Sequence, residues 1–190
     1  VMDNAYHGHT NSLIDLSPYK FNGKGGSGQK KYVHIAEMPD GLRGRWKYSD
    51  KNWIQKYILQ VKLVIDELYA NNKSLSCFFA ESILGCGGQV ILPPNYLKEV
   101  FKIIRKRKAL CIIDEVQTGF GRVGNYFWGF EEHGVIPDIV TLGKPMGNGH
   151  PVAAVITSKK IANIFNNGME YFNSFGGNPV SCAIGNSLLD

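Results

Sequence analysis

The sequence has few cysteines and no hydrophobic run of membrane-spanning length. Its 4 cysteines contain no C-x-x-C pair, and neither they nor the 5 histidines are spaced like metal ligands. Cys77 and Cys111 fall in apolar stretches, as the reduced, buried thiols of a cytoplasmic protein do. No secretory signal is visible. The composition therefore argues against a membrane-spanning protein, a disulfide-stabilised secreted domain and a metal centre.

The excess of positive over negative charge is also small, because the chain has 21 basic and 16 acidic residues and a formal net charge of +5. Much of the positive charge lies in residues 20–31 and 98–108. In the second segment Val100, Phe101, Ile103 and Ile104 form an apolar stripe, and the basic side chains occupy the other face. We interpret them as a solvated helix face, with an anion-binding patch as the alternative. No aromatic residues alternate with the basic ones, so nucleic acid is not an expected partner.

Apolar stretches alternate with helical patterns along the 190 residues, of which 44% are hydrophobic. Strands are expected at residues 1–6, 75–80, 110–113, 139–142 and 152–156. Helices are expected at residues 50–71, 93–108 and from Pro179 onward, with one helical turn at 11–16 and a loop at 19–31. This order predicts one domain of the α/β class, with a mostly parallel sheet covered on both faces in a three-layer αβα arrangement.

Charged side chains stand where three of the predicted strands end. These are Glu81, Asp114 and Lys144. Ligands of parallel sheets bind beyond the carboxyl ends of the strands, so the three side chains are expected near one site. A lone buried Asp or Lys is costly, which suggests a cofactor between Asp114 and Lys144. Pyridoxal phosphate requires such a pair, because a lysine forms a Schiff base with its aldehyde and an acid faces its ring nitrogen.

Four motifs give the chain a family resemblance. They are Tyr6-His7-Gly8, Asp114-Glu115-Val116-Gln117-Thr118-Gly119-Phe120-Gly121-Arg122, Gly143-Lys144-Pro145 and Phe175-Gly176-Gly177-Asn178-Pro179. In this order they resemble the class III aminotransferases, which are pyridoxal phosphate enzymes of fold type I. The resemblance covers nearly the whole chain. It implies that Lys144 is the catalytic Schiff-base lysine and that Asp114 is the catalytic acid at the ring nitrogen.

The same resemblance implies further cofactor-binding residues. Tyr6 matches the residue that stacks on the pyridine ring, and His7 and Gly8 belong to the same loop. Gln117 matches the residue that hydrogen-bonds the ring hydroxyl oxygen. Glu81 matches a glutamate of the polar network near the cofactor, and here it is followed by Ser82 where many members have proline. Ser174 replaces a usual threonine whose hydroxyl reaches the cofactor phosphate of the partner subunit.

Each residue also has a plainer interpretation when it is considered alone. Asp114 could cap the turn after its strand, Tyr6 could be a core residue and Lys144 could lie on a glycine-rich surface loop. Residues 119–124 match the G-x-G-x-x-G pattern of dinucleotide sites. Residues 114–118 separate that pattern from the predicted strand, however, so the tight strand–turn–helix of such a site is missing.

The resemblance implies transfer of an amino group from an amine or amino acid to a keto acid. Residues 17–21, 147–151 and 179–183 look most like a branch that includes alanine–glyoxylate aminotransferase 2-like proteins. Some members of that branch are ammoniophospholyases, which eliminate phosphate from phosphoethanolamine or phosphohydroxylysine, and this reaction is the alternative. An alternative of another class is an inactive fragment without catalysis.

The ends of the chain suggest a part of a longer protein. The sequence starts at Val1 within a predicted strand and stops at Asp190 within a predicted helix. We expect residues 1–190 to be the central part of the cofactor-binding large domain, without its N-terminal segment, upstream phosphate loop and C-terminal small domain. The family implies a homodimer with small-molecule substrates and no membrane partner. A cytoplasmic location is expected, with a mitochondrial one as the alternative.

Overall fold

The computed structural model describes all residues from Val1 to Asp190. A four-stranded sheet in the order β1-β4-β5-β6 forms its centre. These strands are β1 (Cys77–Glu81), β4 (Leu110–Asp114), β5 (Ile139–Leu142) and β6 (Ala154–Thr157). The helices are α1 (Asn11–Asp15), α2 (Pro18–Phe21), α3 (Trp53–Ala70), α4 (Tyr96–Lys106), α5 (Lys159–Phe165) and α6 (Pro179–Asn186), with short 3-10 helices η1 (Gly129–His133) and η2 (Lys144–Gly147). None of the helices has the length and hydrophobicity of a membrane span.

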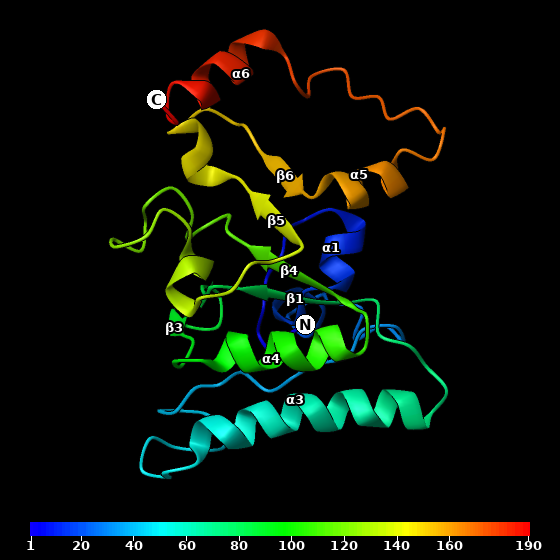
Figure 1. The fold of residues 1–190 in the computed structure, drawn as a ribbon, viewed down its shortest axis with the longest axis vertical. Helices are drawn as coiled ribbons and strands as arrows, with labels where there is room; N and C mark the ends of the chain where they lie inside the picture. The colour runs from blue at the N-terminus through cyan, green and yellow to red at the C-terminus, as the bar shows by residue number, and fades with distance from the viewer.

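The sheet lies between two unequal covers (Figure 1). Helix α4 packs against β4, and α3 packs on α4 as a second helical layer on the same side. The N-terminal segment with α1 and α2 approaches the opposite face, where the His7 ring stacks on Phe79 of β1 at 3.9 Å between ring centroids. Beyond β6 the chain continues through α5 and a long loop into α6, which lies at the far end of the molecule from α3. The predicted α/β class is therefore confirmed.

The strand register places polar side chains in one row. Strand β1 is parallel to β4, so that Glu81 lies opposite Asp114, and β4 is parallel to β5, so that Asp114 lies opposite Thr141. Only β6 is antiparallel to its neighbour. The expectation of a mostly parallel sheet is confirmed, and the carboxyl ends of β1, β4 and β5 meet at one edge.

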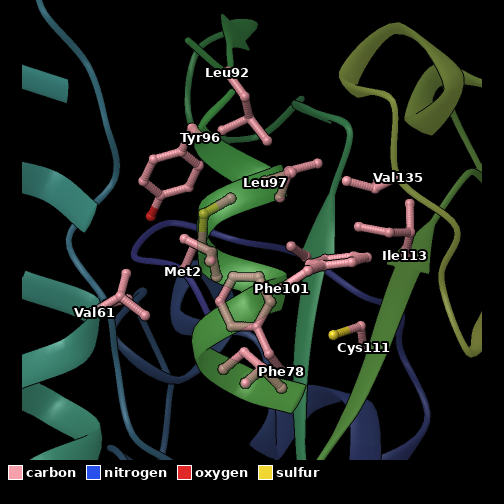
Figure 2. Packing of buried hydrophobic residues seen from close by; sticks show 14 of the residues in the cluster. Met2, Val61, Phe78, Leu92, Tyr96, Leu97, Phe101, Cys111, Ile113 and Val135 are labelled. Atoms are coloured by element: carbon pink, nitrogen blue, oxygen red, sulfur yellow. The ribbon is translucent and has the colours of Figure 1, made fainter. Parts of the chain in front are cut away.

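The main core fills the space between α4 and the sheet (Figure 2). Phe78 of β1 and Cys111 and Ile113 of β4 face the helix, while the alternate residue Phe79 faces the other side. On α4 the buried residues recur with helical spacing, and they are Tyr96, Leu97, Val100, Phe101 and Ile104. The lysines and arginines of this helix lie on its exposed face, as the sequence predicts. Burial raises the pKa of the Cys111 thiol to about 12, so this thiol stays protonated.

Local structure differs from the sequence prediction at several places. The predicted strand at residues 1–6 is only a single bridge between Met2 and Ala36, because Asn4 takes a left-handed conformation with φ 57° that turns the chain away. The predicted loop at 19–31 begins within α2, whose Phe21 is 1% exposed. The two-residue strands β2 (Ile83–Leu84) and β3 (Val90–Ile91) form a hairpin, and together with α5 they were not predicted.

The carboxylate of Glu115 fixes the exit of β4. Glu115 is 0% exposed, and its Oε1 accepts hydrogen bonds from the Ser82 hydroxyl at 2.6 Å and the Phe130 N–H at 2.9 Å. Its Oε2 accepts from the Thr118 hydroxyl at 2.9 Å and the Gly129 N–H at 2.8 Å. A buried carboxylate is tolerated only with such partners. Because the donors come from the end of β1, the turn after β4 and η1, one side chain joins three segments around the sheet edge.

Two buried tyrosines provide a matched test of the core. The hydroxyl of Tyr96 is buried without a hydrogen-bond partner, whereas that of Tyr57 accepts from the Trp46 N–H at 3.2 Å and lies 3.4 Å from the Asp40 carbonyl. We expect Tyr96→Phe to raise the free energy of unfolding by about 1 kcal/mol, because it removes an unsatisfied polar group. We expect Tyr57→Phe to lower it by about the same amount. Urea unfolding of the two variants measures both, and equal losses in the two would contradict the assignment.

A second test concerns Glu115. Glu115→Gln places an amide NH2 against two hydrogen-bond donors, and we expect it to lower the free energy of unfolding by about 1–3 kcal/mol. The control is Glu131→Gln, since the Glu131 carboxylate accepts only the exposed Trp128 N–H at 2.9 Å. That control should change stability by less than about 1 kcal/mol. Urea unfolding midpoints of both variants give the comparison, and an unaffected Glu115→Gln protein would show that the network is not stabilising.

Candidate active site

Asp114 lies at the centre of the row of polar residues on the sheet edge. It ends β4 and is 6% exposed. Its Oδ1 accepts the Val116 N–H at 3.1 Å, and its Oδ2 lies 3.1 Å from Nδ1 of His7. Two contacts from different segments thus fix the orientation of this carboxylate. The plainer interpretation of Asp114 as a turn cap is partly right, because the contact to Val116 is of that kind.

His7 is the partner that sequence reasoning did not specify. Its side chain is 0% exposed, and its ring stacks on Phe79. The backbone N–H of His7 donates to the Ser17 hydroxyl at 2.9 Å, which fixes the loop from the other side. Because a carboxylate can only accept, Nδ1 carries the proton of the contact with Asp114. The Nε2 atom of His7 is buried without a hydrogen-bond partner in this chain.

Glu81 contacts backbone in this structure. Its Oε1 accepts the Tyr6 N–H at 3.1 Å, and its Oε2 accepts the Gly85 N–H at 3.0 Å. Burial raises the pKa of the Glu81 carboxyl above its usual value, and the two N–H groups and His7 offset part of that rise. Glu81 therefore holds the Tyr6 backbone against the end of β1.

Tyr6 and Gly8 shape the loop on this side of the edge. The half-buried Tyr6 ring meets Tyr19 edge-on at 5.9 Å between centroids, and the Lys20 amine lies 5.9 Å from the centre of the Tyr6 ring. Gly8 has φ 131°, and a Cβ there would lie 2.7 Å from Cδ1 of Leu13. The backbone conformation favours glycine at this position, and any side chain would also require the Leu13 side chain to shift.

Lys144 and Gln117 line one polar cavity of about 380 Å³. Lys144 begins η2 with φ 33°, in the left-handed region, and its side chain is exposed. A Cβ on the preceding residue, Gly143, would lie in ordinary van der Waals contact with Val116 at 3.4 Å, so the exits of β4 and β5 are neighbours. A Cβ on Gly85 would lie 2.5 Å from Nε2 of Gln117, which shows how near this amide lies to the loop after β1.

Ser174 lies elsewhere. It is exposed in the segment between α5 and α6, outside the cavity that contains Lys144. The following helix α6 is capped by Asn178, whose Oδ1 accepts the Ser181 N–H at 2.9 Å. His150, a few residues after η2, contacts the Ser181 hydroxyl through Nε2 at 2.8 Å and connects α6 to the segment that carries Lys144. Within one chain, then, Ser174 is not brought to the other predicted site residues.

The donor set at this edge fits pyridoxal phosphate. A carboxylate held by His7 suits a protonated ring nitrogen, and the amide of Gln117 suits a ring oxygen. The amine of Lys144 opens into the same cavity as that amide, where an aldehyde carbon can be reached. The residues present therefore agree with the cofactor that the sequence motifs imply.

Sequence reasoning missed the residues that support this set. Glu115 is one of them. It follows Asp114 directly at the end of a strand, so the two acids point in different directions, and this could have indicated that Glu115 has a separate role. Ser17 and Ser82 are others: nothing local in the sequence marks Ser17, and Ser82 is marked only by standing where many family members have proline. Arg122 also lines the cavity of Lys144, and only its place within the motif hinted at this.

Comparison with known proteins agrees with this geometry. The sequence model of the Aminotransferase class-III family matches residues 1–190. The chain is 46% identical to an alanine–glyoxylate aminotransferase 2-like protein of Drosophila melanogaster, over 100% of this chain and 39% of the fly protein. It is 43% identical to ethanolamine-phosphate phospho-lyase homolog 1 of Caenorhabditis elegans, over 96% of this chain and 42% of the worm protein.

Solved structures share the fold. A phospholyase from Arthrobacter in complex with phosphoethanolamine matches with a TM-score of 0.84 and 32% identity, over 99% of this chain and 44% of the bacterial one. An (S)-enantioselective omega-transaminase from Thermomicrobium roseum matches with a TM-score of 0.82 and 27% identity, over 99% of this chain and 42% of that one. The chain thus spans between 39% and 44% of the length of these proteins. The match of the family over the whole chain shows that the protein belongs to the class III aminotransferases.

Proposed function

We propose that residues 1–190 are the central part of the cofactor-binding large domain of an enzyme that transfers an amino group from an amine or amino acid to a keto acid. The observation that supports this most is the arrangement at the sheet edge. There Asp114 is oriented by His7, and Lys144 and Gln117 open into one cavity. Pyridoxal phosphate is the cofactor that membership of this family implies.

Each residue has a separate task in this proposal. Asp114 holds the positive charge of the ring nitrogen, and the contact from His7 keeps the carboxylate facing it. Gln117 would donate to the ring oxygen, and Tyr6 would cover one face of the ring. Lys144 would hold the cofactor at its aldehyde carbon and, after the substrate amine has replaced it there, would move a proton to and from the substrate carbon. When bound, the cofactor withdraws electrons from the carbon that loses this proton.

Phosphate elimination is the second candidate function. Its support is the 43% identity to a phospho-lyase homologue and the 32% identity to a phospholyase that binds phosphoethanolamine. Removal of a proton by Lys144 begins both reactions. They differ in whether the neighbouring carbon carries a leaving group, which is a property of the substrate pocket.

Assembly and location are further parts of the proposal. We expect a homodimer, in which the segment with Ser174 reaches the phosphate of the cofactor in the other subunit. Large exposed apolar side chains in this segment, such as Phe172 at 77% and Phe175 at 64%, support an interface there. We expect a cytoplasmic enzyme; a mitochondrial one is the alternative, since a human relative with 42% identity is mitochondrial. The isolated 190 residues are expected to be inactive.

The assignment of Lys144 has a direct test in the full-length protein that carries this sequence. Titration with pyridoxal phosphate should produce a visible absorption band, and Lys144→Ala should abolish it because no other amine lies in this cavity. Lys160→Ala, at an exposed position on α5, should leave the band unchanged. If Lys144→Ala kept the band of the unmodified protein, the proposed role of this lysine would be wrong.

The two candidate reactions are separated by their need for a keto acid. With an amine donor, we expect turnover only when a keto acid is present, together with formation of the amino acid that corresponds to it. The measurement is product analysis by chromatography, run in parallel with phosphoethanolamine as the sole substrate. Release of inorganic phosphate and acetaldehyde without any keto acid would assign the phospho-lyase reaction instead.

A further inference from the structure

We propose that Arg122 binds an anionic group of the substrate, a phosphate or a carboxylate, next to Lys144. This inference rests on the proposed function, because it concerns the substrate of the same site. It identifies the kind of amine that the enzyme accepts as one with an oxyanion at its far end. The cavity, the pairing of the arginines and the loop that carries Arg122 each support it.

The cavity contains cationic donors and no carboxylate. It is lined by Gln117, Arg122, Lys144, Pro145, Asn148 and Gly149. The guanidinium of Arg122 offers N–H donors in a planar fork that matches the two oxygens of a carboxylate or a phosphate. In a cavity without an acid the guanidinium of Arg122 attracts an anion, and the amides of Gln117 and Asn148 can add hydrogen bonds to it.

Arg122 differs from the other arginines of the chain in having no acidic partner. The others each pair with a carboxylate: Arg43 with Asp40, Arg45 with Glu37, Arg105 with Asp138 and Arg107 with Asp66. The carboxylates nearest to Arg122 in sequence are already occupied, because Asp114 faces His7 and Glu115 accepts four hydrogen bonds. The guanidinium therefore remains available to an external anion.

The loop presents Arg122 from a fixed backbone. Arg122 and Val123 are the central residues of a turn that the Gly124 N–H closes by donating to the Gly121 carbonyl at 3.0 Å. The Gly121 N–H donates in turn to the Phe127 carbonyl at 2.9 Å, which closes the base of the loop. Aromatic side chains pack there, with centroid distances of 5.4 Å between Phe120 and Phe127 and 4.7 Å between Phe127 and Trp128. A fixed backbone lowers the entropy lost when the side chain binds a ligand.

The phosphate of the cofactor is the other anion that could meet Arg122. The sequence motifs assign that phosphate to Ser174 and to a loop upstream of Tyr6. The cavity shared with Lys144 and Gln117 lies instead where the aldehyde carbon and ring oxygen are expected, and the substrate enters at that carbon. Cofactor affinity must nevertheless be measured to separate the two anions.

The test compares three amines on the full-length protein loaded with pyridoxal phosphate. They are phosphoethanolamine, β-alanine and propylamine, which carry a phosphate, a carboxylate and no anion. We expect Arg122→Met to raise KM for the anionic amines roughly 10- to 100-fold, the range for a lost hydrogen bond to a charged group, with little change for propylamine. Arg122→Lys should retain part of the affinity. Lys106→Met, which removes an exposed cation of α4, is the control and should change nothing.

A binding measurement accompanies the kinetics. Calorimetric titration with 2-aminoethylphosphonate, which has no phosphate ester to lose, should show the same loss of affinity in Arg122→Met. The dissociation constant of pyridoxal phosphate should stay unchanged in this variant. A loss restricted to phosphoethanolamine identifies a phosphate subsite, and a loss for both anionic amines identifies a general oxyanion subsite.

The outcomes distinguish failure of this inference from failure of the proposed function. If the unmodified protein forms no visible band and converts none of the amines, the proposed function is wrong and this inference falls with it. If the unmodified protein is active, equal effects of Arg122→Met on anionic and uncharged amines would overturn the role of Arg122 alone. So would weaker cofactor binding with unchanged discrimination between the amines, because Arg122 would then bind the cofactor phosphate.

Discussion

Parallel hydrogen bonding between β1, β4 and β5 determines where the polar side chains at the ends of these strands lie. It brings three carboxyl ends to one edge and places Glu81, Asp114 and Thr141 side by side. A shift of β4 by one residue would turn Asp114 toward α4, because successive side chains of a strand face opposite sides. The core between α4 and the sheet prevents that shift, since Cys111 and Ile113 would leave it at the same time. Packing of apolar residues on the sheet face that contacts α4 thus determines the position of Asp114 on the opposite face.

Two consecutive acids at the end of β4 serve different purposes because their surroundings differ. Glu115 accepts four hydrogen bonds from protein donors, which satisfies both oxygens and leaves nothing for a ligand. Asp114 receives one backbone N–H and the His7 ring, so its oxygens retain capacity to accept. The same functional group therefore stabilises the strand exit at position 115 and, at position 114, remains able to accept the hydrogen bond that the proposed function assigns to it.

The sequence was most informative where a continuous apolar run defines a strand and a charged residue ends it. The strand at residues 139–142 was predicted with its observed bounds, and Glu81, Asp114 and Lys144 follow from the same rule. The contact between His7 and Asp114 could not be predicted, because it joins residues 107 positions apart and depends on how the N-terminal loop returns to the sheet. Hairpin β2–β3 was missed because strands of two residues carry no periodic pattern. Glu115 and Ser82 were missed because their importance lies in mutual hydrogen bonds that no local pattern reveals.

The chain divides into a well-packed part that contains Asp114, Gln117 and Lys144 and a C-terminal part with little core of its own. After η2 only Ser181 and Gly185 are buried, while Ile164, Phe165 and Met169 are each more than 60% exposed. Exposed apolar surface of this extent is characteristic of interfaces rather than of free surfaces. Ser174, which the proposed function assigns to the cofactor phosphate, lies in that second part, and the residues that it assigns to the cofactor ring lie in the first. A cofactor held by both parts would therefore link its own binding to the docking of the C-terminal part. The hydrogen bond between His150 and Ser181 is one of the contacts that connect α6 with the segment of Lys144.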